Sequence, residues 1–288
     1  MRFLGPEDTR TALPMQDAIE SQEVAFTEKS EAPLRSQLGG SLVMPGRVGD
    51  AMAVKVVSTV PGNPVGLVAV FGSDGSPMGI VDGPTLTAIR TGAGCGLATK
   101  LLADESVSTL AMLGSGSMAF DQVEAVKAVR PIEHILIWSR SPEHAQHLAD
   151  RVGGEVVTDA DDAVSRADVV SCATPATEPL FDPDSVPEGA HINAIGAFKP
   201  EMVEIPAEVL NRAFVVVDDY EAAAAEAGDL IQADRTANAS LFEMMAGTNP
   251  QIGEDVTVFK SVGIAAQDVA AAHRALLNAE RRGVGVEI

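Results

Sequence analysis

The chain has 288 residues, of which 46% are hydrophobic and 21% are charged. This length can bury the cores of two domains, and the composition is typical of globular rather than disordered proteins. The 41 acidic and 20 basic residues give a net charge of −21. Such a charge repels nucleic acid and anionic membranes, so we expect neither as a partner. No stretch reaches the roughly 18 uninterrupted apolar residues of a membrane-spanning helix.

The N-terminal residues and the cysteines predict a cytoplasmic protein. The first ten residues, MRFLGPEDTR, lack the apolar core of a secretion signal. Cys95 and Cys172 are far apart in the chain and have no metal-type spacing. We therefore expect reduced thiols and no metal site.

The first third of the chain changes from a helical pattern to a strand pattern. Met15–Phe26 has helical periodicity within a polar stretch that covers residues 1–33. Ser73–Pro77 has the composition of a hairpin connection, and the short connections favour an antiparallel or mixed sheet. The expected strands are Leu42–Met44, Met52–Val57, Gly66–Phe71 and Met78–Val81.

Three basic residues stand apart in this region: Arg35, Lys55 and Arg90. Lys55 lies in the apolar run AVKVV, where burying an unpaired ammonium is costly, so it faces either solvent or an anion. Arg90 lies in an expected helix, Thr85–Ala103, among small residues that suit close approach of backbone or ligand. The alternative for Arg90 is a stem packed on the core with its head in water.

A strand, glycine-rich turn, helix and strand follow in the order of a dinucleotide-binding unit. Apolar runs at Leu110–Leu113 and Ile135–Trp138 flank the unit. The small residues of the motif have three explanations: they allow a tight turn, they let the backbone approach a pyrophosphate, and they let the helix pack closely on the sheet. The alternative is a plain connection in a parallel sheet. The residues of the motif are Gly114, Ser115, Gly116, Ser117, Met118 and Ala119.

The end of the second strand predicts the choice of cofactor. NAD sites usually have Asp or Glu about 20 residues beyond the glycines, whereas this chain has Ser139, Arg140 and Ser141. A guanidinium between hydroxyls suits a 2′-phosphate, so we expect NADP(H) to be preferred, with NAD(H) possible. The alternative is a solvated strand-end arginine.

Strands and helices alternate beyond this unit, which predicts parallel βαβ connections. Ligands bind at the carboxyl ends of such strands, which are here Ala173-Thr174-Pro175, Gly196 and Asp218. The alternative for Asp218 is the N-cap of helix Tyr220–Ala227, a task that Asp219 can also perform. The expected strands are Gly154–Thr158, Val169–Thr174, His191–Gly196, Phe214–Asp218 and Thr257–Gly263, with helices at Asp161–Ala167 and Ile264–Arg282.

Taken together, these motifs resemble the ornithine cyclodeaminase and mu-crystallin family of NAD(P)-dependent proteins. The likeness extends over the whole chain and is carried by LTAIRTGAGCGLATKLLA, LGSGSMA, WSRS, GAHINAIGA, VVVDDYEAAAAEAGDL and TVFKSVG. The resemblance implies an α/β fold with a Rossmann-like dinucleotide-binding domain at residues 107–264. Residues 1–106 with 265–288 would form an α+β domain that binds substrate and forms a homodimer.

The resemblance also assigns roles to single residues. It implies that Arg35, Lys55 and Arg90 anchor the carboxylate of a small α-imino or α-amino acid. Asp218 would be the acidic catalytic residue, and Lys55 could also polarise the reacting centre. The nicotinamide would lie near Thr91 and Ser261.

Two departures from the family pattern guide the choice of reaction. Met118 stands where Gln is common, so one polar contact near the phosphates is missing. Ornithine cyclodeaminases have a Glu ahead of the Met-Pro step and an Asn-Gly-His-Pro segment after the lysine, where this chain has Leu42-Val43 and Pro61–Asn63, so the acidic group that would bind a distant ammonium is absent. We therefore expect an NAD(P)H-dependent oxidoreductase that acts on the C=N or C–N bond of a small acid. A cyclic ketimine reductase, such as a Δ1-pyrroline-2-carboxylate reductase, and an amino acid dehydrogenase both fit. The alternatives are an ammonia-lyase that forms proline and a non-catalytic, mu-crystallin-like ligand binder.

Overall fold

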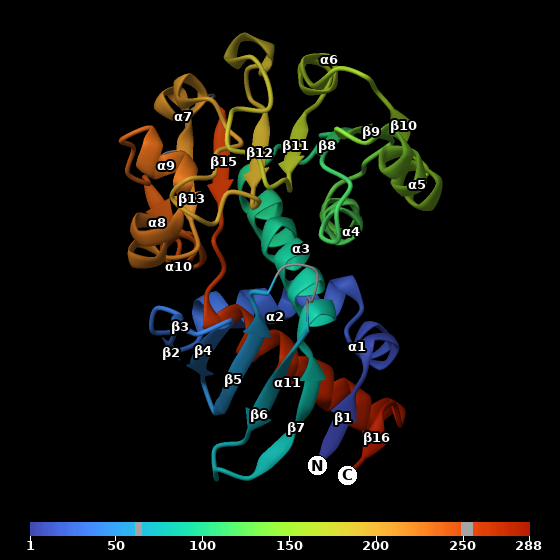
Figure 1. Ribbon diagram of the computed structural model, residues 1–288, viewed down its shortest axis with the longest axis vertical. Helices are drawn as coiled ribbons and strands as arrows, with labels where there is room; N and C mark the ends of the chain where they lie inside the picture. The colour runs from blue at the N-terminus through green and yellow to red at the C-terminus, as the bar shows by residue number, and fades with distance from the viewer. Residues whose placement is uncertain (61–64, 249–255) are drawn as a thin grey trace. The chain divides into compact units, whose positions relative to one another are not determined.

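A computed structural model describes residues 1–60, 65–248 and 256–288 (Figure 1). The chain divides into two compact units: unit 1 comprises Met1–Gly94 and Gly263–Ile288, and unit 2 comprises Cys95–Val262. The first division lies inside helix α3 (Gly83–Leu102), whereas the sequence places it after residue 106. Pro61–Asn63, where the sequence departs from the family pattern, lies outside the described residues.

Unit 1 is built on a mixed sheet, as predicted. Neighbouring strands from β4 to β7 are antiparallel, while β1 is parallel to β7 and antiparallel to β16. The order is β16-β1-β7-β6-β5-β4-β2, with β3 also beside β4. The strands are β1 (Arg2–Leu4), β2 (Ser30–Glu31), β3 (Ser36–Leu38), β4 (Ser41–Val48), β5 (Ala51–Ser58), β6 (Gly66–Phe71), β7 (Pro77–Asp82) and β16 (Val286–Glu287).

Two strand assignments in unit 1 correct the sequence analysis. Residues 1–33 are not helical throughout, because Arg2–Leu4 forms β1 beside β7. Strand β4 continues four residues past the expected end at Met44, through Pro45 and Gly46, paired with β5 up to Val48. Proline is tolerated where pairing on one side is incomplete, and β2 and β3 each cover only one end of β4.

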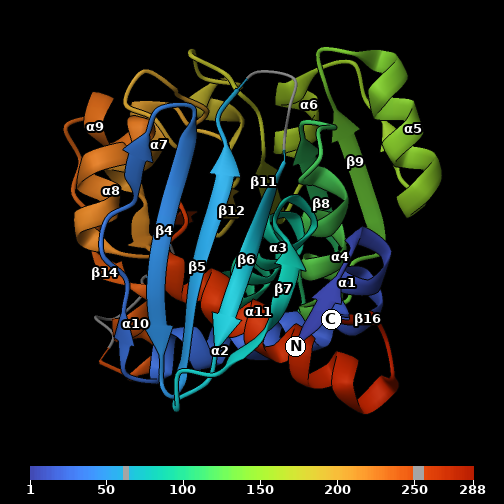
Figure 2. The same cartoon turned by 60° about the horizontal axis from the view of Figure 1, so that its bottom comes forward.

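The C-terminal helix returns to unit 1 and covers one face of its sheet. Helix α11 (Ala265–Arg282) contacts β4 to β7, and α2 (Met15–Thr27) packs against α11. Figure 2 shows the sheet with these two helices behind it and no helix in front of β4 to β7 within this unit. The close approach requires glycine in the strands, because a Cβ at Gly79 would lie 2.6 Å from Leu276 Cδ2. A further helix, α1 (Pro6–Ala12), lies beside α11.

Unit 2 has the Rossmann-like fold that the sequence predicts. Its described strand pairs are all parallel, in the order β10-β9-β8-β11-β12-β15-β13-β14. The chain leaves β8 first toward β9 and later toward β11, so the carboxyl ends of β8 and β11 form a topological switch point. The strands are β8 (Thr109–Leu113), β9 (His134–Trp138), β10 (Glu155–Val156), β11 (Val169–Cys172), β12 (His191–Ala194), β13 (Phe214–Val217), β14 (Ala239–Ser240) and β15 (Thr257–Lys260).

Apolar side chains of the strands and helices form the core of unit 2. Leu110 and Met112 on β8 pack with Val123 and Val126 on α4 in one buried cluster. The helices are α4 (Ala119–Val129), α5 (Pro142–Val152), α6 (Ala160–Ser165), α7 (Ala207–Arg212), α8 (Tyr220–Glu226), α9 (Gly228–Gln232) and α10 (Leu241–Met245), with a 3₁₀ turn at Pro183–Ser185. Among the helices of the described ranges, none has the length and apolar character needed to cross a bilayer.

Candidate functional site

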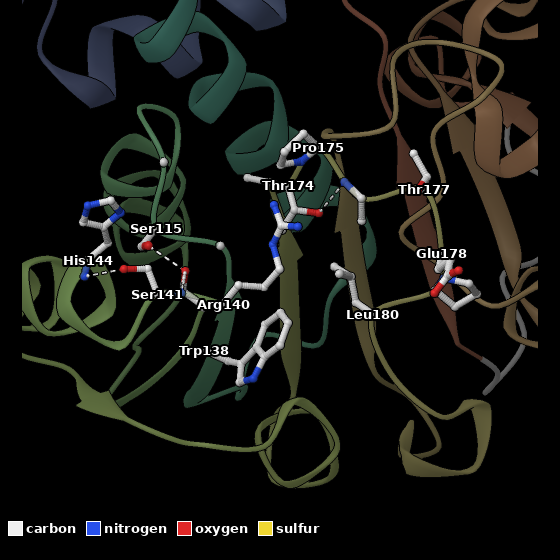
Figure 3. A pocket seen from close by; sticks show the side chains of 16 residues that line it. Ser115, Trp138, Arg140, Ser141, His144, Thr174, Pro175, Thr177, Glu178 and Leu180 are labelled. Atoms are coloured by element: carbon white, nitrogen blue, oxygen red, sulfur yellow. Dashed lines mark hydrogen bonds between the residues drawn. The ribbon is translucent and has the colours of Figure 1, made fainter.

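A pocket of about 460 Å³ lies in unit 2 at the carboxyl ends of β8, β9 and β11 (Figure 3). We call it the cofactor pocket. The sequence analysis predicted eight of its lining residues: Gly114, Gly116, Ser139, Arg140, Ser141, Ala173, Thr174 and Pro175. It assigned no cofactor contact to Ser115 or Trp138, although they lie in the glycine motif and in WSRS. It missed His144 and residues 176–180, which carry no motif of their own.

The glycines of the turn have the geometry that a pyrophosphate site needs. Gly114 has a φ of +114°, and its N–H donates to the Trp138 carbonyl over 2.9 Å. A Cβ at Gly114 would lie 2.7 Å from the Ala173 carbonyl oxygen, whereas one at Gly116 would meet no atom within 4 Å. The first glycine is therefore required by the fold. The second leaves open space beside the backbone, which suits a dinucleotide.

Three predicted cofactor residues of this loop lie around the start of α4 and are not among the lining residues. Ser117 precedes the helix, Met118 is its N-cap residue, and Ala119 begins it and is fully buried in the core cluster. Ala119 thus serves the close packing of helix on sheet that the motif predicts. The helix N-terminus follows the open space beside Gly116, so its dipole favours an anion there.

Hydroxyl and guanidinium groups form the β9 side of the pocket. Ser115 Oγ donates to Ser139 Oγ over 2.8 Å, and Ser141 caps α5 by accepting from the His144 N–H. The exposed Arg140 side chain extends into the pocket toward Thr174 (Figure 3). Among the described lining residues one is acidic, Glu178, and it lies in the loop after β11 rather than at the end of β9.

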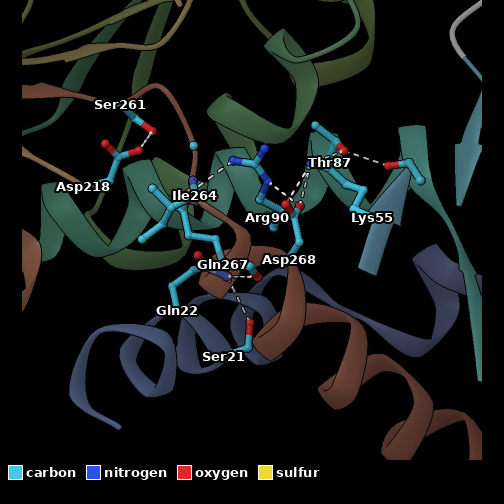
Figure 4. Close-up of polar contacts among 12 residues, drawn as sticks. Ser21, Gln22, Lys55, Thr87, Arg90, Asp218, Ser261, Ile264, Gln267 and Asp268 are labelled. Carbon is cyan, nitrogen blue, oxygen red and sulfur yellow. Dashed lines mark hydrogen bonds and ion pairs between the residues drawn. The ribbon is translucent and has the colours of Figure 1, made fainter. Parts of the chain in front are cut away.

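Asp218 lies at the carboxyl end of β13 in unit 2 and is fully buried. Its Oδ2 accepts from Ser261 Oγ over 2.7 Å and from the Val262 N–H over 3.1 Å (Figure 4). Asp219 caps α8 by accepting from the Ala222 N–H. Capping is therefore the task of Asp219, and the structural alternative for Asp218 does not hold. Thr91, the remaining predicted cofactor residue, is half-buried on α3 in unit 1.

Unit 1 holds a buried cluster of two cations around one carboxylate (Figure 4). The Lys55 ammonium lies 2.8 Å from Asp268 Oδ2, and Arg90 Nε lies 3.0 Å from Asp268 Oδ1. Lys55, Arg90 and Asp268 are 3%, 5% and 2% exposed, so neither cation takes the solvent-facing alternative. We call these three side chains the cationic cluster.

Arg35 adds a third positive charge near this cluster. It is half-buried, donates to the Gly263 carbonyl over 3.4 Å and acts electrostatically on Lys55. Burial lowers the pKa of Lys55 to about 8; Asp268 opposes this shift, while Arg90 and Arg35 add to it. Burial also opposes ionisation of Asp268, but Arg90 and Lys55 hold the pKa of Asp268 below its usual value. Three cations against one carboxylate leave an excess of positive charge, which suits an anionic ligand.

Asp268 is the functional residue that the sequence analysis missed. It lies in the first turn of α11, and Gln267 beside it accepts from the Ile264 N–H and faces Arg90 Nη1 at 3.4 Å. Gly263 also leaves room for the Arg90 guanidinium, because a Cβ at Gly263 would lie 2.7 Å from Arg90 Nη1. The available signal was an acidic residue inside the alanine-rich run IAAQDVAAAH, where burying an unpaired charge is costly.

These features agree with one known protein family. The model of the ornithine cyclodeaminase/mu-crystallin family matches residues 12–281. The chain belongs to this family. Both the predicted family and the predicted fold are thereby confirmed.

Several members of the ornithine cyclodeaminase/mu-crystallin family are similar along the full chain. A Delta(1)-pyrroline-2-carboxylate reductase of Bacillus cereus is 34% identical, over 100% of this chain and 99% of the relative. The structure of the Thermococcus litoralis Delta(1)-pyrroline-2-carboxylate reductase in complex with NADH and L-proline has a TM-score of 0.93, with 31% identity and 100% coverage of both chains. An archaeal alanine dehydrogenase dimer with bound NAD has a TM-score of 0.92, with 28% identity over 100% of this chain and 98% of the other.

Proposed function

We propose that this family member reduces the C=N bond of a small cyclic α-imino acid, such as Δ1-pyrroline-2-carboxylate, with NAD(P)H. The observation that carries the proposal is the buried cationic cluster with Arg35 beside it, because a substrate carboxylate is the anion that such a group recognises. The full-length similarity to two Delta(1)-pyrroline-2-carboxylate reductases supports the substrate class.

The residues of each unit have distinct tasks in the proposed reaction. Arg35, Lys55 and Arg90 hold the carboxylate and so fix the orientation of the adjacent imine carbon. Asp218 supplies the proton that the imine nitrogen gains, and Ser261 and the Val262 N–H orient its carboxyl group. The nicotinamide, when bound, supplies the hydride that the imine carbon gains. The main task of Lys55 is to bind the substrate carboxylate, and its positive charge also polarises the imine.

The reaction is tested by the fate of the cofactor. Purified protein mixed with Δ1-pyrroline-2-carboxylate is expected to oxidise one NAD(P)H for each proline formed, followed by absorbance at the nicotinamide band and by chromatography. Release of ammonia from ornithine without added reductant would instead identify an ammonia-lyase. Binding of the imino acid with no turnover would identify a ligand binder. A parallel panel of amino acids with NAD(P)⁺ separates the amino acid dehydrogenase.

We propose further that the cofactor pocket prefers NADP(H). Arg140 extends into the pocket between two serines, and its guanidinium offers paired donors to a 2′-phosphate. His144 lines the same side, and its imidazole ring offers an N–H donor. The described acidic lining residue, Glu178, belongs to the opposite loop.

Replacing Arg140 by Ala is expected to weaken NADPH binding by roughly 10- to 100-fold, since a charge-assisted contact is lost. The affinity for NADH is expected to change little, because NADH lacks the 2′-phosphate. Fluorescence titration of both cofactors measures the two dissociation constants. Tighter binding of NADH than of NADPH by the unmodified protein would refute the preference.

We propose that a second copy of the chain covers the open face of the unit 1 sheet. Phe3, Met52 and Leu67 on this face are 41%, 45% and 43% exposed. The strand registers join Val54, Ala69 and Ile80 into one apolar row that continues to Phe3. Apolar faces of this kind usually mark an interface, and the similar alanine dehydrogenase is a dimer.

A charge on this face is expected to separate the two copies. Leu67→Glu would place a carboxylate in an apolar interface, where it loses its hydration without a partner. Sedimentation velocity is expected to show a dimer for the unmodified chain and a monomer for the variant. Ile231→Glu, at an exposed position of α9 in unit 2 rather than on this sheet, is the control and is expected to stay dimeric. A monomer in the unmodified sample would contradict the proposal.

A further inference from the structure

We infer that Glu204 is a positioning residue that holds two backbone segments of the cofactor-binding unit in register. This inference rests on the proposed function only in that the pocket binds a dinucleotide. Glu204 is fully buried between the end of β11 and the end of β12. Oε1 accepts from the Thr174 N–H over 2.6 Å and from Thr174 Oγ1 over 2.9 Å. Oε2 accepts from the Gly196 N–H over 2.6 Å and from the Ala197 N–H over 3.2 Å.

All four partners of this side chain are donors. Three are backbone N–H groups, which cannot reverse their role, and only an ionised carboxylate can accept from four donors with both oxygens. Protonated Glu204 would place its own O–H against one of these donors. The glycine at position 196 makes room for this side chain, because a Cβ at Gly196 would lie 2.5 Å from Glu204 Oε1. The arrangement therefore requires a negative charge in a buried position.

A second buried carboxylate holds the backbone from which Glu204 projects. Asp229 Oδ1 accepts from the N–H groups of Glu204 over 2.6 Å and Ile205 over 3.0 Å. Asp229 Oδ2 lies 2.7 Å from the fully buried Lys260 ammonium. Lys260 directly precedes Ser261, the residue that donates to Asp218. One buried network thus joins the loop that lines the cofactor pocket to the strand end that orients the proposed proton donor.

The charges around Glu204 set the pH range of its effect. Burial raises the pKa of Glu204 to about 6; Lys260 opposes the shift, Asp229 adds to it, and the hydrogen bonds from Thr174 oppose it. Cys172 on β11 also faces the pair, and burial with the nearby Glu204 and Asp229 charges raises the pKa of that thiol, which stays neutral. Because the Glu204 pKa is raised to about 6, the carboxylate is lost as the pH falls through about 6, and one of the four acceptor positions becomes an O–H that faces a donor.

The Thr174 loop is the part of the pocket that this carboxylate holds. Thr174 and Pro175 line the pocket, and Gly114 packs directly against the Ala173 carbonyl. When Glu204 no longer accepts from Thr174, the loop loses its anchor, and the cofactor must order the loop as it binds. The expected result is weaker binding of the cofactor, whether or not an imino acid is present.

The test is Glu204→Gln, measured by fluorescence titration of NADH without substrate. Glutamine keeps the shape but turns an amide N–H₂ toward two donors, so the dissociation constant is expected to rise roughly tenfold at pH 7.5. NADH is used because the 2′-phosphate of NADPH titrates near pH 6 itself. In the unmodified protein, NADH binding is expected to weaken from pH 7 to pH 5. In the variant this dependence is expected to be absent.

A second variant and a control separate positioning from stability. Thr174→Val removes one of the four hydrogen bonds at a half-buried loop position and is expected to raise the NADH dissociation constant by about threefold. Glu208→Gln makes the same chemical change at an exposed position of α7 and is expected to leave binding unchanged. A Glu204→Gln protein that melts earlier but keeps the affinity and pH dependence of the unmodified chain would overturn the inference. A pH dependence that persists in the variant would assign it to another group and would also overturn the inference. Failure of imine reduction would leave these binding results unaffected.

Discussion

Replacing Asp218 by Asn is expected to lower kcat for imine reduction by about 10²- to 10⁴-fold, because the proposed proton donor is lost. Asparagine has nearly the same shape, and its amide oxygen can still accept from Ser261 Oγ and the Val262 N–H, the partners of Asp218 Oδ2. The loop at the end of β15 therefore keeps its anchor. Asparagine loses the hydrogen bond that the Asp219 N–H donates to Asp218 Oδ1 over 3.1 Å. Binding of NADPH is expected to stay within about threefold of the unmodified protein, since no charged contact to the cofactor changes.

The matched variant for this prediction is Ser261→Ala. It removes the hydroxyl that orients Asp218 at 2.7 Å but leaves the carboxyl group and the Val262 N–H in place. A loss of kcat by roughly tenfold is expected, which corresponds to about 1.4 kcal/mol and so to one hydrogen bond. Single-turnover mixing of the NADPH-bound protein with imino acid measures the chemical step apart from product release. Full turnover by Asp218→Asn would show that another group donates the proton.

Replacing Lys55 by Met is expected to raise the KM for the imino acid by roughly 10- to 150-fold, because one charge-assisted contact to the carboxylate is lost. The substitution keeps an apolar stem of similar length inside β5, and Asp268 keeps its ion pair with Arg90. The free energy of unfolding is therefore expected to change by less than the binding free energy that corresponds to the rise in KM. The affinity for NADPH, titrated without substrate, is the internal control.

The pH dependence of kcat/KM gives the sharper version of this prediction. With a Lys55 pKa of about 8, the cation is lost as the pH rises, so kcat/KM is expected to fall above pH 8. Asp268 favours the charged form of Lys55, so Asp268→Asn is expected to move this decline to lower pH. Lys55→Arg is expected to abolish the decline below pH 10, since a guanidinium stays protonated. A decline that Asp268→Asn leaves in place would assign it to another group.

The cofactor-binding half of this protein could be predicted from local sequence. The apolar runs of β8 and β9, the glycine turn and the helical period between them lie within 31 consecutive residues, from Leu110 to Arg140. Each strand, turn and helix of that unit is determined by residues close to it in the chain. The sequence therefore identified Gly114, Gly116 and Arg140 together with the strands and helix that position them. The isolated cations Lys55 and Arg90 were also visible, because a charge inside an apolar run needs a partner.

The residue that pairs with these two cations follows from the tertiary structure alone. Asp268 is 213 residues from Lys55 in the chain, and Glu204 is 30 residues from Thr174. The strand β1 was likewise missed because its partner β7 lies more than 70 residues away. Periodicity reports which face of an element is buried, but an ion pair or strand pair is fixed by the packing of distant elements. Most elements and the chemical groups they carry could therefore be predicted from local sequence, whereas the pairing of strand β1 and of the buried charges follows from how the distant elements pack.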